Sequence, residues 1–261
     1  MTLELSGPRL RLALEGLVAR AEEQGGVEAY VEALKIKSAL FRDTLQGEPE
    51  ISAFRTLCAH IATVRRRIGP YLAPARFDEL RSHIARLLEG REDTSSADAR
   101  MAAFCAAFPE DRDHRWVRDL AAEILHNVDP ERYPLMQRWV WDARTNTGVI
   151  REIWHGEDVD RITLDVPDCY ATFLMLREEL AQYLASNGVF RDVLFYVDVL
   201  TAQVYAEYIG ERGSTYLRTD FATPEDPMLH TRRILGLDGV DALGRTRLKA
   251  AHGVAEIVQE S

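Results

Sequence analysis

Two Glu-x-x-His pairs are the side chains of this sequence whose spacing could hold a metal ion. Glu123 precedes His126 by three positions, and Glu152 precedes His155 in the same way. On a helix this spacing puts both side chains on one face, and carboxylate-bridged di-iron bundles combine two such pairs with further glutamates from other helices. No further glutamates stand out, and the fold of 146–164 is not clear from its pattern. We therefore expect no bound metal and no cofactor.

Asp198 is a second candidate, because it interrupts an otherwise apolar segment. Residues 193–204 are apolar on nearly every side of a helix, which predicts that this helix is buried. A buried carboxylate must be paired or neutralised, since its desolvation costs several kcal/mol. Three alternatives follow: an internal ion pair with an arginine, a carboxyl group with a raised pKa in a pocket, or exposure on a narrow polar face.

A long segment, 213–233, joins two expected helices and is rich in hydrogen-bonding side chains. Its arginines, its histidine and the helix N-terminus expected after Pro227 would suit an anion. The alternative is a strap across the bundle whose polar groups satisfy buried charges. We expect Arg218 or an arginine of the following helix to reach Asp198, so that segment and carboxylate form one electrostatic unit. The candidate binding residues of this segment are Tyr216, Arg218, Asp220, His230, Arg232 and Arg233.

All four tryptophans fall between Trp116 and Trp154, where they mark either the centre of a core or a binding surface. Tryptophan is bulky, and its indole N–H needs a partner when it is buried. A helix expected over 133–142 would turn Trp139 and Trp141 about 200° apart. One indole is therefore expected in the core and the other beside an arginine on the surface, as at a protein interface. The candidate residues of this cluster are Arg138, Trp139, Trp141, Arg144 and Trp154.

Composition and charge narrow the class of protein. The chain has 261 residues, of which 46% are hydrophobic and 28% are charged, which is close to ordinary globular usage. The formal net charge of −10 argues against broad nucleic-acid binding through a basic surface. Three widely spaced cysteines fit neither a disulfide framework nor a zinc site. No apolar stretch is long enough to span a bilayer, so we expect a cytoplasmic protein without a membrane partner.

Apolar residues recur at helical spacing along most of the chain, so helices must position the candidate side chains described above. This periodicity predicts an all-α multi-helix bundle, possibly with two packed helical halves and with at most a short β-hairpin near 148–164. The linker-like stretch Gly90–Ser96 would separate an N-terminal helical region, 1–92, from a C-terminal helical domain, 96–261, that carries the tryptophan cluster and the 213–233 segment. The expected helices lie at about 7–24, 27–45, 50–67, 75–89, 96–107, 113–127, 133–142, 168–186 and 189–211.

No catalytic constellation is complete in the sequence, and whether the protein is an enzyme stays open. A serine nucleophile elbow, a phosphate loop, a dinucleotide fingerprint and a Cys/His zinc site are all missing. We therefore expect a cytosolic non-enzymatic accessory or regulatory protein that binds a protein partner, possibly a second copy of itself, through its Trp/Arg-rich surface. The alternative is an enzyme or sensor for a small phosphate- or carboxylate-bearing anion that uses Asp198 and the 213–233 segment.

Overall fold

The computed structural model describes residues 3–156, 159–216 and 228–239. Within these ranges the protein is an all-α bundle without strands, which confirms the predicted fold class. The ten α-helices of the described ranges are α1 (Gly7–Ala21), α2 (Gly26–Leu45), α3 (Ile51–Ala59), α4 (Pro74–Leu88), α5 (Ala97–Ala106), α6 (Trp116–Val128), α7 (Val149–Glu152), α8 (Tyr170–Ser186), α9 (Val193–Tyr216) and α10 (Leu229–Ile234).

Prolines and glycines set several of the helix boundaries that the sequence predicts. Pro8 and Pro74 lie in the first turns of α1 and α4, where the missing N–H of proline leaves no helical hydrogen bond unmade. Gly25 and Gly188 follow the turns that end the α1 and α8 segments, with φ of 91° and 90°. These left-handed conformations suit glycine, because a Cβ atom makes them unfavourable.

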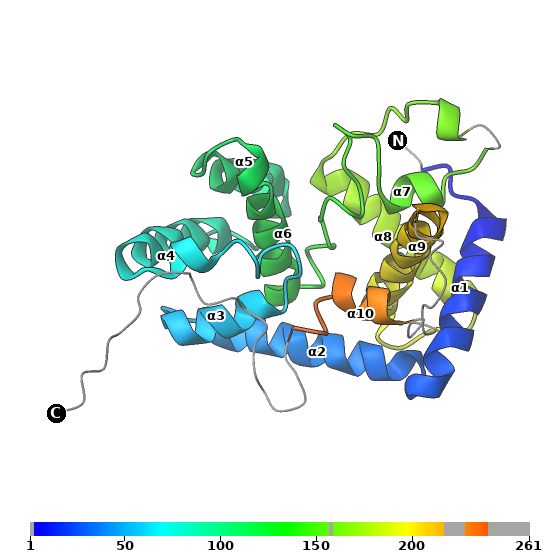
Figure 1. Cartoon of the computed structure of the whole chain (residues 1–261), viewed down its shortest axis with the longest axis horizontal. Helices are drawn as coiled ribbons and strands as arrows, with labels where there is room; N and C mark the ends of the chain where they lie inside the picture. Colours follow the sequence, from blue (N-terminus) through cyan, green and yellow to red (C-terminus); the bar gives the residue numbers. More distant parts are fainter. Residues whose placement is uncertain (1–2, 157–158, 217–227, 240–261) are drawn as a thin grey trace.

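Helix α2 is the element around which the bundle is arranged. It packs against α1, α3, α6 and α9, and Figure 1 shows it running along one side of the molecule with α10 lying over its middle. Helices α4, α5 and α6 pack together over one end of α2, and α1, α8 and α9 pack over the other. Helix α2 therefore contacts helices from both predicted parts of the chain, and the division near 90–96 stays a prediction.

The helix expected over 133–142 is absent, and an irregular chain takes its place. The Val140 carbonyl accepts a hydrogen bond from the Ile150 amide at 3.3 Å, and Asp142 forms an isolated bridge with Thr147. These bonds give the backbone partners outside its own segment. The apolar side chains here are buried on several sides at once, which a helix packed along one face would not allow.

The segment around 148–164 contains the short helix α7 and one 3-10 turn, and its described residues form no hairpin. Gly148 begins it with φ of 126°. A Cβ atom at this position would lie 2.7 Å from the Val140 carbonyl oxygen, so glycine is needed for the close approach of the two segments.

Helix α3 ends at Ala59, earlier than the sequence predicts, and turns carry the chain through 61–68. Two glycines of the C-terminal segment lie close to the carbonyl groups at the end of this helix. A Cβ atom would lie 1.7 Å from the His60 carbonyl oxygen at Gly236, and 2.0 Å from the Ala59 carbonyl oxygen at Gly239. The end of the helix is therefore in tertiary contact with glycines far along the chain, where a larger residue would not fit.

Candidate functional site

Asp198 lies on α9 and is buried, and within the described residues the charged group in contact with it is a histidine; the expected partner Arg218 lies outside those residues. Oδ2 of Asp198 lies 3.1 Å from Nε2 of His126 on α6, and both side chains are 7% exposed. The other ring nitrogen, Nδ1, lies 2.9 Å from the Tyr133 carbonyl oxygen. Burial lowers the pKa of His126, but the charges of Asp198 and Glu123 outweigh it, and the pKa lies above its ordinary value. Of the alternatives, an internal ion pair fits best.

A second buried ion pair connects α2 with the same face of α6. Nζ of Lys37 lies 2.9 Å from Oε2 of Glu123, with exposures of 4% and 2%. Glu123 also accepts hydrogen bonds from Nδ2 of Asn127 at 2.6 Å and from Nε2 of Gln137 at 2.7 Å. Lys37 donates to the Leu235 carbonyl at 2.8 Å. Each charge therefore has several polar partners, which a buried pair requires.

The described part of the C-terminal segment, 228–239, is a strap across the bundle. Arg65 forms a bidentate ion pair with Asp238, at 2.8 and 3.1 Å, with both side chains buried. Nε of Arg233 lies 3.7 Å from the same carboxylate. Within the described residues Arg233 therefore pairs with a carboxylate of its own segment and not with Asp198.

The other residues predicted in this segment divide into two groups. His230 and Arg232 lie on α10, which packs against α9. Tyr216 is the last residue of α9, and nothing is described of its side chain. Arg218 and Asp220 lie outside the described residues.

The tryptophans belong mainly to the core, and the expectation that one of the central pair is exposed is wrong. Trp139 is 8% exposed and Trp141 is fully buried. The Trp141 indole donates to the Val166 carbonyl at 3.0 Å, and that of Trp139 donates to the Gln137 side chain. Without a helix at 133–142, the two indoles do not project from opposite faces. Trp154 is half-buried and pairs with Leu5 in an isolated bridge.

The two Glu-x-x-His pairs lie in different surroundings. Glu123 and His126 are engaged in the buried network, whereas Glu152 ends α7, where its carbonyl accepts a hydrogen bond from Arg9 of α1 at 2.8 Å. Among the described residues, no group of three or more His, Cys, Asp or Glu side chains is arranged to hold a metal ion.

Arg138 and Arg144 line a cleft of about 820 Å³ between α5, the start of α6 and the irregular chain at 138–144. This volume lies within the range of about 300–1,000 Å³ that is usual for small-molecule sites. The charged side chains and the histidine that line the cleft are Glu110, Asp111, Arg112, His114, Arg115, Arg118, Arg138, Asp142, Arg144 and Asp168.

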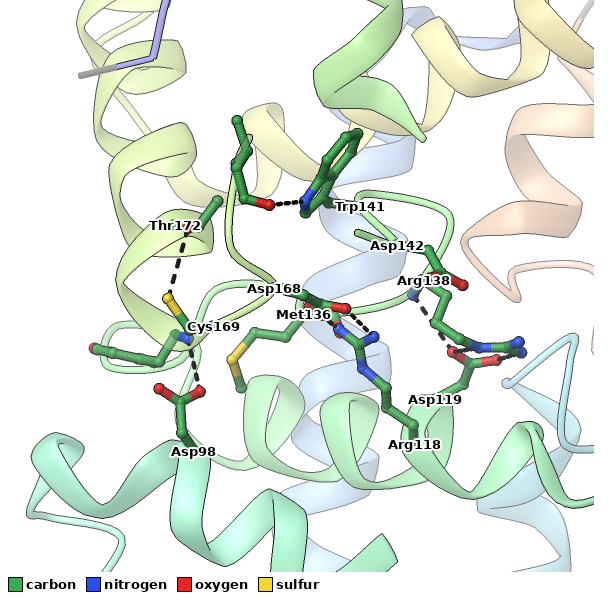
Figure 2. A network of polar contacts seen from close by, with 12 residues as sticks. Asp98, Arg118, Asp119, Met136, Arg138, Trp141, Asp142, Asp168, Cys169 and Thr172 are labelled. Atoms are coloured by element: carbon green, nitrogen blue, oxygen red, sulfur yellow. Dashed lines mark hydrogen bonds and ion pairs between the residues drawn. The ribbon is translucent and has the colours of Figure 1, made fainter. Parts of the chain in front are cut away.

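Two arginines of the cleft are fixed by carboxylates, as Figure 2 shows. Both terminal nitrogens of Arg118 on α6 donate to Asp168, which precedes α8. Arg138 donates to Asp119 from Nε at 3.2 Å and from Nη2 at 2.8 Å. Burial lowers the pKa of Arg138, but Asp119 and the nearby charge of Asp142 outweigh it and raise the pKa. Both guanidinium groups are thus held in one orientation.

The rim of the cleft carries three exposed arginines, Arg112, Arg115 and Arg144, that form no ion pair within the described residues. His114 at the same rim lies 2.7 Å from Asp111. Five arginines and four carboxylates line the cleft, a balance of +1 with histidine neutral (5 − 4). This contrasts with the net charge of −10 for the whole chain.

Sequence reasoning missed most of the cleft. Arg112, Arg115 and Arg118 follow one another at intervals of three, a spacing that places side chains on one side of a helical segment. This signal is weak in a chain with 29 arginines (32 basic residues less three lysines). The pairing of Arg118 with Asp168 spans 50 positions, and no local pattern reports it.

None of the helices in the described ranges is both long and apolar enough to cross a membrane. Comparison of the chain with protein-family models, with curated proteins and with solved structures gives no match.

Proposed function

We propose that the protein binds a small anionic ligand, bearing a phosphate or carboxylate group, in the cleft lined by the five arginines. The observation that carries the proposal is the arrangement of those arginines. Two are oriented by carboxylates at the floor, and three stand at the rim without an ion pair among the described residues. Arginine suits this role because its planar guanidinium matches the geometry of carboxylate and phosphate groups.

The fixed arginines still have hydrogen-bond donors to offer. A guanidinium carries five N–H groups, and Nη1 of Arg138 donates to no acceptor within the described residues, while Nε of Arg118 likewise makes no such bond. Their carboxylate partners hold them in place, which reduces the entropy lost when a ligand binds. The exposed arginines at the rim add attraction without the cost of burying a charge.

The alternative of a protein partner held by the Trp/Arg-rich surface stays a prediction, as does a cytoplasmic location. The buried indoles of Trp139 and Trp141 remove the anchors on which that surface was to depend. The proposed ligand is still a small anion, as in the second alternative from the sequence. The proposed binding site is now the cleft instead of Asp198 and the 213–233 segment.

Isothermal titration calorimetry with inorganic phosphate and with citrate, at constant ionic strength, tests the proposal. We expect saturable binding to one site and a rise in melting temperature with ligand concentration. The double variant Arg115→Gln/Arg144→Gln removes two rim charges and should weaken binding by about tenfold or more, since a hydrogen bond to a charged group contributes about 1.5–3 kcal/mol.

Arg86→Gln is the matched control, because Arg86 is exposed on α4, has no ion pair among the described residues and does not line the cleft. Its affinity for phosphate should equal that of the unaltered protein. Absence of binding by both anions, or an equal loss in the control variant, would overturn the proposal.

A further inference from the structure

A second cavity, of about 420 Å³, lies beside the arginine-lined cleft. The two hollows share part of their walls, so they are neighbours rather than separate sites. The residues that line both are Ala102, Cys105, Arg118 and Asp168. The ion pair between Arg118 and Asp168 therefore stands at their common border, where Figure 2 shows it between α6 and the start of α8.

The lining of this second cavity is less charged and more apolar than that of the cleft. Met101, Met136 and Phe173 line it, and these apolar side chains are buried, with total exposures of 9%, 2% and 2%. Of the described charged residues in its wall, Asp98 already accepts a hydrogen bond from the Tyr170 amide at 2.8 Å. The other two charges are those of the Arg118–Asp168 pair, which face each other.

We propose that the ligand of the cleft is an amphiphilic anion, with its anionic head group among the arginines and an apolar tail in the second cavity. This inference rests on the proposed function, because the cleft supplies the site of the head group. Ligand sites commonly combine apolar walls with a few polar groups that fix orientation. Here the two kinds of lining are separated into adjoining hollows, which matches a ligand whose two ends differ in the same way.

The uncharged part of the common border gives the tail its path. Ala102 and Cys105 lie one turn apart on α5, and Ala102 is exposed and carries only a methyl group. A tail can pass these side chains while Arg118 keeps its bonds to Asp168. The Arg118 guanidinium also lies 6.0 Å from the centre of the Phe173 ring, which lines the second cavity. Arg118 is therefore in contact with a side chain of each hollow.

A series of n-alkyl phosphates, from methyl to octyl phosphate, compared with inorganic phosphate by calorimetry, tests this inference. All have the same head group, so a change in affinity along the series reports on the tail. We expect each added methylene to tighten binding up to about fourfold, since burying a methylene is favourable by about 0.8 kcal/mol, until the cavity is full.

Ala102→Phe fills the path and should abolish the dependence on chain length, so that every alkyl phosphate binds this variant with the same affinity as methyl phosphate. Ala103→Phe is the control, because Ala103 is also exposed on α5 but lines neither cavity. It should behave as the unaltered protein does in both measurements.

The outcomes separate the two proposals. Binding of inorganic phosphate with equal affinity for every alkyl phosphate overturns the tail site and keeps the anion site. Absence of binding by phosphate and by all its alkyl esters overturns both. A chain-length dependence that persists in Ala102→Phe overturns the path and hence the inference.

Discussion

The substitution Glu123→Ala should destabilise the protein strongly, because it leaves the ammonium group of Lys37 without its counter-ion in the core. Lys37 is 4% exposed, and its described polar partners are the Glu123 carboxylate at 2.9 Å and the Leu235 carbonyl at 2.8 Å. Removing one partner of a buried pair costs about 3–5 kcal/mol. Gln137 also loses the acceptor of its 2.7 Å hydrogen bond, which adds about 1 kcal/mol. The expected total of about 4–6 kcal/mol is a large part of a stability of typically about 5–15 kcal/mol.

A second variant separates the charge effect from the loss of packing. Lys37→Met/Glu123→Leu removes both charges and keeps apolar volume, so it should cost only about 1–2 kcal/mol, mainly for the amide of Gln137. Glu32→Ala is the surface control, because Glu32 pairs with Lys35 on the same helix at exposures of 61% and 38%. Its loss should be within about 0.5 kcal/mol.

Urea denaturation followed by tryptophan fluorescence measures all three variants, because urea leaves the ionic strength unchanged and Trp141 is fully buried in the folded state. The reasoning is refuted if Glu123→Ala loses less than about 1 kcal/mol. It is also refuted if the double variant loses as much as the single one, because the cost would then not arise from an uncompensated charge.

Three further predictions concern titration and thiols. The folded pKa of His126 lies above its ordinary 6.5, so its stabilisation is present below pH 6.5 and lost as pH rises through the folded pKa; His126→Asn should flatten this slope in urea titrations, and an unchanged slope would contradict it. Burial, with Lys37 nearby, lowers the pKa of His60 to about 4, so stability should fall by about 3 kcal/mol as pH drops from 6.5 to 4, and His60→Gln should lose less over that range. Burial raises the pKa of the Cys58 thiol; iodoacetamide should therefore alkylate the half-buried Cys169 and Cys105 before Cys58 in the native protein, and mass spectrometry showing Cys58 modified first would refute the burial.

The helices that the sequence predicts correctly have glycine or proline at their ends and apolar residues along one face. The boundaries of α1, α2 and α4 follow from glycine and proline positions and from 3.6-residue periodicity. For 133–142 the same reasoning predicted a helix that is absent, because the apolar side chains of this segment are buried on several sides of an irregular chain. Periodicity cannot distinguish that arrangement from a helix.

The site was predicted less well than the fold, and the reason is sequence separation. The burial of Asp198 follows from the apolar residues around it, and the structure confirms it. Its histidine partner lies 72 positions away on α6 (198 − 126), and in a chain with many arginines an arginine was the natural expectation. The pairing of Arg118 with Asp168 depends in the same way on tertiary structure, which brings the two residues together only after the bundle forms.

The strap at 228–239 has a consequence for how the chain reaches its native state. Its contacts with Lys37 and Arg65 join residues that are 198 and 173 positions apart, which makes them among the latest that a growing chain can form. During synthesis, α2 and the turns at 61–68 leave the ribosome long before their partners in the strap exist. Native closure of the bundle must therefore follow translation of almost the whole described chain, and loop closure over such distances slows folding. Until then, Lys37 lacks the carbonyl partner that the strap supplies, and Arg65 lacks its carboxylate partner Asp238.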